Sequence, residues 1–387
     1  MNHSRIYNLY TCIKLGSKLH PLESLIGYGL ILPYIFSENI HVCNWFLQNL
    51  IIQTFIFIPI AFIPSWFTKQ IFYVDIAWPT GVMMIGLQLI HFSNSLAKGA
   101  IINTSDHATF KLLSQYPFFV GIALAIHGAR MAFGALFMFY PYHRSEDLPR
   151  YRYAKLRFIY ETGGVANEMW NIKIIQEIFQ QYYANAVVLS CIGAIMIDAI
   201  TRSGVNDAVH GYSFPFTWIG LIIWLIAWLF ENMADMQKTY FMIQMKKMRS
   251  KEKSDAPKTY YVLGYKPFDG QRYFLWTRCR HPNYFFEWLA WWGFVISVLP
   301  SLYHLHTVVE CGFNNILSWL ILLMFIPRLF YDCLLYWTGA APAEHFSHRK
   351  RGQMYGNYQI STRVFFPFYV PFVNHAKVEG WSTLDQM

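Results

Sequence analysis

The sequence predicts an all-α protein, a polytopic membrane helix bundle with seven or eight transmembrane helices. Three observations support this fold class. Charged residues make up only 14% of the 387 residues, whereas soluble domains average about 25%. Apolar residues account for 55% and aromatic residues for 19%, which excludes a disordered chain because so much apolar surface must be buried. Apolar runs of about 20 residues, the length that crosses a bilayer, recur along the whole sequence.

These runs define the predicted elements in order. The eight segments are 22–37, 44–67, 74–92, 117–140, 182–200, 215–237, 284–300 and 313–338. The first segment is short, so the number of spans is predicted as seven or eight. The third contains Asp75 and Pro79, and the fourth contains His127 and Arg130. We therefore do not expect either of these two helices to face lipid on all sides.

The distribution of Lys and Arg predicts the orientation. Of 31 such residues, 26 lie in segments that eight spans would place on one face, 3 on the other face and 2 inside spans. Because positive residues favour the cytoplasmic side, both termini and the long connectors 141–181 and 238–283 are predicted to be cytoplasmic. The expected location is the endoplasmic reticulum in a eukaryote or the inner membrane in a bacterium.

The same distribution argues against nucleic acid as a partner, although the net charge is +9. The basic residues follow the topology, and no nucleic-acid-binding motif is present. The 6 Cys residues include no CxxC pair, and His345 and His348 do not form an HExxH motif. We therefore predict no metal site.

A first polar cluster lies at the predicted end of the sixth span. Glu231 and Asp235 are four residues apart, hence on one helix face, and Lys238 follows them. A helix C-terminus disfavours carboxylates, so this pair indicates a bound polar ligand. The alternative is that both acids pair with nearby cytoplasmic Lys or Arg side chains.

A second cluster precedes the seventh span. Pro282 suits a first helical position, which places Arg280 and His281 at a helix N-terminus. That end repels cations and attracts phosphate, so an anionic ligand is predicted there. Asn283 and Glu287 share one helix face, and Glu287 lies about one turn inside the bilayer, where an ionisable residue is a functional candidate.

Two further clusters have structural alternatives. Beyond the last span, Glu344 and His348 belong to a stretch rich in basic and aromatic residues, which could also be a polybasic segment attracted to anionic lipid. Arg130, inside the fourth span, needs a partner in the membrane. An internal ion pair with Asp75 is the simplest one.

Five motifs occur in the same order as in a known group of membrane enzymes. They are VDIAWPTG at 74–81, RSEDLPRY at 144–151, ENMADMQK at 231–238, RHPNYFFE at 280–287 and PAEHFSHRKRGQMYGNYQISTRVFFP at 342–367. On these motifs the chain resembles the steroid 5-alpha-reductase superfamily. This group also includes sterol C14 and C7 reductases and, more distantly, isoprenylcysteine carboxyl methyltransferases. The likeness is closest to a little-characterised branch of reductase-like multipass proteins.

The resemblance implies an all-helical membrane fold whose cytoplasmic loops hold NADPH, with a lipophilic substrate that enters from the lipid bilayer. The cofactor-binding residues that it implies are Glu231, Asp235, Lys238, Trp276, Arg280, His281, Asn283, Tyr284, Glu344, His348 and Tyr355. Catalytic roles fall on Glu287, which would face a substrate carbonyl, and on Arg130 and His127. His127 stands near the position of a Tyr that helps to polarise the carbonyl in steroid reductases. Met242 replaces an Arg of the sterol-reductase pattern.

The predicted function is NADPH-dependent reduction of a carbon–carbon double bond in a steroid-like or other lipophilic substrate. A Glu287 kept protonated by burial would donate to the carbonyl oxygen as the cofactor supplies hydride. Two alternatives remain open: an S-adenosylmethionine-dependent membrane methyltransferase, and a non-enzymatic lipid-binding membrane protein. We predict three regions, an N-terminal membrane extension (1–70), the reductase-like transmembrane domain (71–370) and a cytoplasmic tail (371–387).

Overall fold

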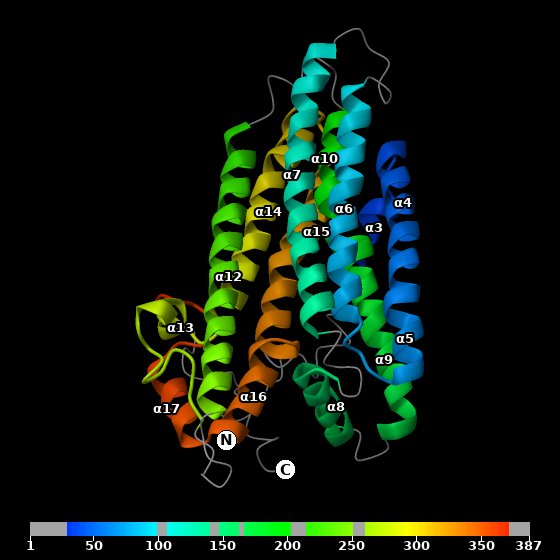
Figure 1. The fold of residues 1–387 in the computed structure, drawn as a ribbon. Coiled ribbons are helices and arrows are strands. Elements are labelled where there is room, and N and C mark those ends of the chain that lie inside the picture. The colour runs from blue at the N-terminus through cyan, green and yellow to red at the C-terminus, as the bar shows by residue number, and fades with distance from the viewer. Residues whose placement is uncertain are drawn as a thin grey trace, which may run out of the picture. The chain divides into compact units, whose positions relative to one another are not determined.

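The described part of the protein is mainly helical. The computed structural model describes residues 29–98, 107–139, 147–161, 166–202, 214–250 and 260–370. Seven helical segments in these residues are long and apolar enough to cross a membrane (Figure 1), which confirms the predicted fold class. The α-helices, π-helical turns (η1, η2, η3, η5) and 3-10 turn (η4) are α3 (Leu32–Ile35), α4 (Ile40–Phe57), η1 (Ile58–Phe62), α5 (Ile63–Thr68), α6 (Val74–Ala97), α7 (His107–Gly134), η2 (Ala135–Phe139), α8 (Pro149–Glu161), α9 (Ala166–Tyr183), η3 (Ala184–Leu189), α10 (Cys191–Arg202), α12 (Phe214–Arg249), η4 (Gln271–Tyr273), α13 (Phe274–Arg278), α14 (Pro282–Thr307), α15 (Phe313–Asp332), η5 (Cys333–Trp337), α16 (Ala340–Arg351) and α17 (Gln353–Ser361).

Seven of the eight predicted spans correspond to these segments. The segments are Ile40–Thr68, Val74–Ala97, Ser114–Phe137, Trp170–Arg202, Pro215–Arg249, Pro282–Thr307 and Phe313–Arg351. The predicted first span, 22–37, differs. Its residues 22–28 lie outside the described part of the chain, and the remainder contains the four-residue helix α3. The predicted tail, 371–387, also lies outside the described residues.

The sixth predicted span, 215–237, ends too early. Helix α12 continues for 36 residues, to Arg249, and its last turn carries Lys246, Lys247 and Arg249. Cations are favoured at a helix C-terminus by the macrodipole, so this end suits the longer helix. Glu231 and Asp235 therefore lie inside α12, and their predicted position at a helix C-terminus was wrong.

The described residues form two compact units. Unit 1 contains residues 225–250, 260–290 and 329–370. Unit 2 contains the remaining described residues, which are those before 225 and those from 291 to 328. The division falls within α12, α14 and α15, so it is not a linear one. The linear regions predicted from the sequence stay a prediction.

The first span of unit 2 shows how local sequence sets the helix bounds. Asn39 caps α4, because its side-chain oxygen accepts a hydrogen bond from the backbone N–H of His41 at 3.0 Å. Pro59 lacks a backbone N–H, and the helix widens there into the π-helical turn η1. Helix α5 ends at Lys69, whose φ of 59° is left-handed.

Buried amides join α4, α6 and η3 in unit 2. The Gln53 side chain donates to the carbonyl of Gly81 at 3.1 Å, and the Asn185 side chain donates to the carbonyl of Trp78 at 2.8 Å. Asn185 also donates to the Gln53 side-chain oxygen at 3.2 Å. Side-chain hydrogen bonds of this kind hold membrane helices together where no hydrophobic force acts between them.

Helices α6 and α7 lie side by side in unit 2 (Figure 1) and approach most closely at glycines. A Cβ atom added to Gly86 would lie 2.5 Å from the Gly121 carbonyl oxygen, and one on Gly128 would lie 2.4 Å from the Met83 amide nitrogen. Both neighbours are backbone atoms, which cannot swing aside. The close contact therefore requires residues without a side chain, as small residues do in other membrane helix pairs.

We expect Gly128→Ala to lower the apparent melting temperature of the detergent-purified protein. Overpacking of this kind typically costs about 1–3 kcal/mol. Gly134→Ala is the matched control, because Gly134 ends the same helix and a Cβ atom added there would have no neighbour within 4 Å among the described residues. Equal melting temperatures for the two variants would show that α6 and α7 can separate without loss of stability.

The start of α6 is held by the RSEDLPRY segment. The Asp147 carboxylate accepts hydrogen bonds from the backbone N–H groups of Ile71 at 2.7 Å and Phe72 at 3.0 Å. Asp75 accepts from Arg150 at 2.5 Å and from the Tyr151 hydroxyl at 2.6 Å. Asp75 thus pairs with Arg150, and the predicted ion pair between Asp75 and Arg130 was wrong. The sequence offered no means to rank two Arg residues as partners of one Asp.

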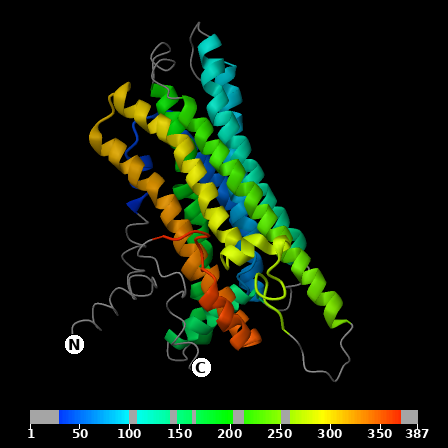
Figure 2. The same ribbon diagram turned by 90° about the vertical axis from the view of Figure 1, so that its left-hand side faces the viewer.

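Unit 1 brings three of the five sequence motifs together. Its parts are the second half of α12, the loop 260–270, α13, the first turns of α14, η5, α16 and α17. Helices α16 and α17 lie next to each other (Figure 2). A core of buried side chains joins the end of α12 to the loop and to α13; its members are Ala234, Phe241, Met245, Leu263, Phe268, Tyr273, Leu275 and Trp276.

Candidate functional site

The candidate site in unit 1 is organised around a buried ion pair between Arg280 and Glu344. Both side chains are fully buried. The Arg280 Nε atom donates to Glu344 Oε1 at 2.7 Å, and its Nη2 atom donates to Oε2 at 3.2 Å. The remaining nitrogen, Nη1, donates to the backbone carbonyls of Gln359, at 2.9 Å, and Thr362. Two-point pairing of this type is strong and geometrically specific.

His281 belongs to the same network. Its Nε2 atom lies 2.9 Å from Glu344 Oε1, and its ring stacks on Tyr284 with centroids 5.2 Å apart. Burial lowers the pKa of His281, and the hydrogen bond to Glu344 opposes that shift in part. Gln359 donates to the second Glu344 oxygen at 2.8 Å. The sequence predicted an anionic ligand as the partner of Arg280 and His281. In the structure the carboxylate of Glu344 is that partner.

Backbone contacts fix the segment before α14. Cys279 and Arg363 form an isolated parallel bridge, and the Arg280 N–H donates to the Arg363 carbonyl at 2.7 Å. Burial raises the pKa of the Cys279 thiol to about 12, so it is unreactive at neutral pH. The chain that enters α14 is therefore held against the chain that leaves α17.

Trp276 joins α13 to α12 and α17. Its indole N–H donates to the Ala234 carbonyl at 3.0 Å, and its own carbonyl accepts from the Tyr358 hydroxyl at 2.6 Å. Gly264 approaches the same carbonyl with a φ of 83°, and a Cβ atom there would lie 2.3 Å from the Trp276 oxygen. Tyr355 and Tyr358 are buried, and burial raises the pKa of both phenols well above the usual value.

Acidic side chains of α12 face the first turns of α14. Asp235 accepts a hydrogen bond from the Asn283 side-chain amide at 3.1 Å. One turn along each helix, Glu231 and Glu287 are both buried, and their carboxylate oxygens lie within 4.8 Å of one another. The motifs ENMADMQK and RHPNYFFE are thus in contact through two pairs of residues, one turn apart.

Two further polar atoms on these helices are buried and accept no hydrogen bond from any described residue. They are Asn283 Oδ1 and Gln237 Oε1. Lys238 is exposed, and its ammonium lies 6.0 Å from the centre of the Trp276 ring. An acceptor on each helix and a cation at their edge are groups that could bind the hydroxyls, amide and phosphates of a nucleotide.

Three predicted residues remain, which are His348, His127 and Arg130. His348 is exposed on α16. His127 lies in unit 2, is fully buried and makes edge-on ring contacts with Trp291 and Phe294. Arg130, half-buried, follows it on α7. The catalytic roles of His127 and Arg130 stay predictions.

Sequence reasoning missed three contributors to the site, which are Gly264, Gln359 and Thr362. Gly264 lies in the stretch YVLGYKPFDG, whose glycines and proline are typical turn signals, but nothing in that stretch identifies Trp276 as its neighbour. Gln359 and Thr362 act on Glu344 and Arg280, and Thr362 does so only through its backbone carbonyl. Every residue has a backbone carbonyl, so the type of residue does not reveal such a contact.

Comparison with known proteins gives one match. A family described as a protein of unknown function (DUF1295) matches residues 61–362, which is most of the chain. No curated protein and no solved structure matches the chain. The matched range includes the five motifs except for the last residues of the C-terminal one.

Proposed function

We propose a function for this chain, which belongs to the DUF1295 family of proteins of unknown function, from the chemistry of the residues in unit 1. It is a membrane-embedded, NADPH-dependent reductase of a carbon–carbon double bond in a steroid-like or other lipophilic substrate. The resemblance of its motifs to the steroid 5-alpha-reductase superfamily supports this reaction class. So do the seven long apolar helices, because a lipophilic substrate dissolves in the bilayer that surrounds them.

The observation that carries the proposal is the row of polar side chains between α12 and α14. Asn283 and Asp235 form one pair of this row, and Glu231 and Glu287 form the next. Two carboxyl groups as close as Glu231 and Glu287 repel each other when both are ionised. Burial adds a further cost to each charge. We therefore expect the pair to keep a proton, which Glu287 can donate.

The residues at this row fit NADPH. Asn283 Oδ1 and Gln237 Oε1 are buried acceptors that no described residue satisfies, and the amide and ribose groups of a nicotinamide nucleotide are donors. Lys238 is exposed, with its ammonium 6.0 Å from the centre of the Trp276 ring, and is suited to a phosphate. Arg280 does not contact the nucleotide in this proposal. Its hydrogen bonds to Glu344 and to the α17 segment hold the start of α14 in place.

Bound NADPH would supply the hydride that adds to the β-carbon of a conjugated alkene. The protein would supply the rest of the reaction. A protonated Glu287 donates a hydrogen bond to the substrate carbonyl, whose oxygen becomes negative as the hydride arrives, and such preorganised donors stabilise developing charge. The carboxyl pair then delivers its proton to the α-carbon, so that the double bond becomes saturated, and the pair would regain a proton from solvent when the product leaves. The buried surroundings of Glu231 and Glu287 exclude water from this step.

Nucleotide titration tests the proposal. Detergent-purified protein is titrated separately with NADPH and with S-adenosylmethionine, and binding heat is recorded. We expect saturable binding of NADPH alone. Lys238→Gln should weaken NADPH binding about tenfold, equivalent to about 1.4 kcal/mol. Lys266→Gln is the matched control, because Lys266 is an exposed lysine of unit 1 in the loop 260–270.

Other outcomes of the titration would replace the proposal. Binding of S-adenosylmethionine without NADPH would identify a methyltransferase. Binding of neither nucleotide by folded protein would favour a lipid-binding protein without enzymatic activity. Equal losses in the Lys238 and Lys266 variants would show that NADPH is attracted by general positive charge and does not contact Lys238.

A further inference from the structure

Unit 2 contains a cavity whose residues play no part in the proposed reaction. Its volume is about 300 Å³, and it is lined by the end of α10, the last turn of α14 with the connector that follows, the start of α15, and α3 with the two residues after it. α10 and α14 end at this cavity, and α15 begins there. The cavity therefore lies at the ends of three long helices, where a bilayer changes from acyl chains to head groups.

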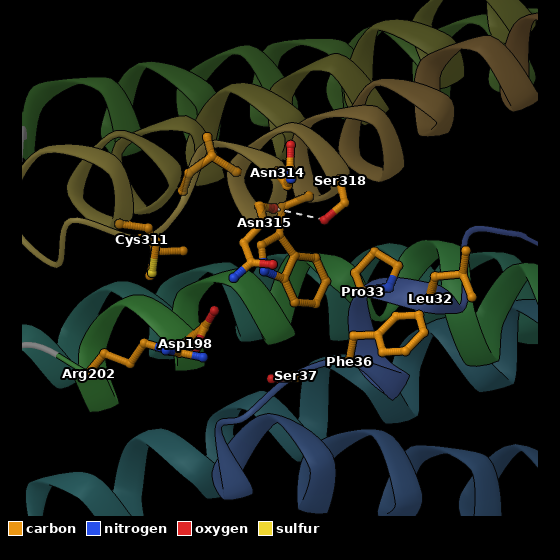
Figure 3. Close-up of a pocket in the computed structure, with 13 residues that line it drawn as sticks. Leu32, Pro33, Phe36, Ser37, Asp198, Arg202, Cys311, Asn314, Asn315 and Ser318 are labelled. Atoms are coloured by element: carbon orange, nitrogen blue, oxygen red, sulfur yellow. Dashed lines mark hydrogen bonds and ion pairs between the residues drawn. The ribbon is translucent and has the colours of Figure 1, made fainter.

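One side of the cavity carries an ion pair between a buried aspartate and a half-buried arginine (Figure 3). Asp198, 3% exposed, accepts from Arg202 Nε at 2.7 Å and from the Asn39 side-chain amide at 2.8 Å. Asn39 also donates to the Thr201 hydroxyl at 2.8 Å. Asp198 is thus neutralised and fixed by two donors. The pair is built into the fold, because Asn39 at the same time caps α4 through its oxygen.

Arg202 has donors beyond those it uses on Asp198. Its one hydrogen bond within the described residues leaves from Nε, whereas a guanidinium carries five N–H groups in a fork that matches phosphate geometry. Its side chain is 26% exposed. Asn314 and Asn315 line the cavity in the first turn of α15, the end of a helix that favours anions, although the Asn315 N–H itself donates to the Gly312 carbonyl at 2.9 Å. The cavity can therefore bind a phosphate from two sides.

The opposite side is apolar. Leu32, Pro33 and Phe36 line it (Figure 3), and Leu32 and Phe36 are 48% and 72% exposed. Trp319 closes the cavity and is itself held edge-on against Tyr34, with ring centroids 5.2 Å apart. An apolar wall that continues onto an exposed apolar helix suits an acyl chain, which can leave the cavity along α3 into the bilayer.

A further charge near the cavity limits which class of lipid head group can bind. Glu38 is exposed and interacts electrostatically with Arg202. A purely anionic ligand on Arg202 would meet the repulsion of this carboxylate. A head group that carries a phosphate and an ammonium can place the first on Arg202 and the second near Glu38. Such a head group matches the charges of the cavity without excess of either sign.

We propose that this cavity binds a zwitterionic phospholipid or lysophospholipid. The phosphate contacts Arg202 and the first turn of α15, the ammonium faces Glu38, and the acyl chain lies against Leu32, Pro33 and Phe36. The site holds its ligand at the ends of the unit 2 helices and is independent of the proposed reductase activity. A protein that binds no NADPH could still have this lipid site.

Cys311 lines the cavity as a partly exposed free thiol, so it reports on the occupant. A variant that keeps only Cys311 is labelled with a maleimide in a maltoside detergent. Three matched additions are compared: myristoyl lysophosphatidylcholine, monomyristoylglycerol, which has the chain without the charged head, and glycerophosphocholine, which has the head without the chain. We expect only the first to slow labelling, by at least about tenfold at saturation.

Variants localise the effect. Arg202→Gln, in which Asp198 keeps its bond to Asn39, should abolish the protection. Ser318→Phe, which fills part of the cavity without touching the ion pair, should do the same. A variant that keeps only Cys333 is the control for general detergent effects, because Cys333 is partly exposed and does not line the cavity. Its labelling rate should not change with lysophosphatidylcholine.

A second readout does not depend on labelling. Native mass spectrometry of the wild-type protein should show one retained lysophosphatidylcholine, and the Ser318→Phe variant should show none. The proposal is overturned if glycerophosphocholine protects as well as the whole lipid, which indicates an ion site. It is also overturned if monomyristoylglycerol protects equally, which indicates an unspecific apolar cleft, or if neither method detects a bound lysophospholipid.

Discussion

Glu287→Leu is expected to reduce turnover by roughly 10²–10³, the usual cost of removing one preorganised donor to a developing oxyanion. Glu287 is buried on α14, one turn beyond Asn283, and its carboxylate lies within 4.8 Å of that of Glu231. Glu287→Gln keeps a donor of the same shape and should retain part of the activity. The measurement is NADPH oxidation that depends on an added enone steroid, with each variant at saturating cofactor.

The NADPH affinity of the same variants provides the control. It should stay close to that of the wild type, because the groups proposed to bind the nucleotide are Asn283, Gln237 and Lys238. A Leu variant with full turnover would mean that Glu287 is a buried structural acid and no donor. A Leu variant that loses turnover and cofactor affinity together would move Glu287 from the reaction to the cofactor site.

Glu344→Ala is expected to cost about 3–5 kcal/mol of stability, because it leaves the buried Arg280 charge without its partner. Glu344 also accepts hydrogen bonds from Gln359 and contacts His281, so one substitution breaks the link between α14, α16 and α17. The loss of monodisperse protein after heating, followed by size-exclusion chromatography, measures this effect. Asp269→Ala is the matched control, since Asp269 is an exposed acid in the same unit.

The double variant Arg280→Met with Glu344→Leu separates charge from packing. Replacing both members of a buried ion pair with apolar residues is often tolerated, so the double variant should be more stable than Glu344→Ala. If Glu344→Ala is as stable as Asp269→Ala, the pair does not hold unit 1 together. Arg280 would then again be a candidate for direct phosphate binding.

The spans were predictable because each depends on a local property, a run of about 20 apolar residues. Seven of eight predicted segments match the structure for that reason. The end of α12 was predicted too early because the prediction followed the apolar run alone. The helix continues beyond that run to Arg249. From Met236 to Arg249 the sequence contains good helix formers, such as Met, Gln and Lys, and the loss of hydropathy there marks only a change of surroundings.

For the candidate site, the sequence indicated segments but not the contacts between them, and the functional roles of the residues stay predictions. RHPNYFFE and ENMADMQK were each identified from charge in apolar surroundings, and the structure places Asn283 beside Asp235. The partner of Arg280 was not predictable, because Glu344 is 64 residues away and several other acids were available. A buried cation can bind either a ligand or a carboxylate far away in the sequence. Which of the two it binds depends on the tertiary fold, and a pattern of residue types does not specify that.

The length of α12 has a consequence for how the membrane acts on this protein. A helix of 36 residues measures about 54 Å, whereas the hydrocarbon layer is about 30 Å thick. Its apolar run, from Phe214 to Phe230, spans only about 26 Å, and Glu231 follows at once. The depth of the carboxyl pair is thus set by how this short apolar run matches the local bilayer. A thicker membrane would draw Glu231 toward the acyl chains or reduce the tilt of the helix. Reconstitution in lipids of graded acyl length would therefore change the proposed reductase activity without any change of sequence.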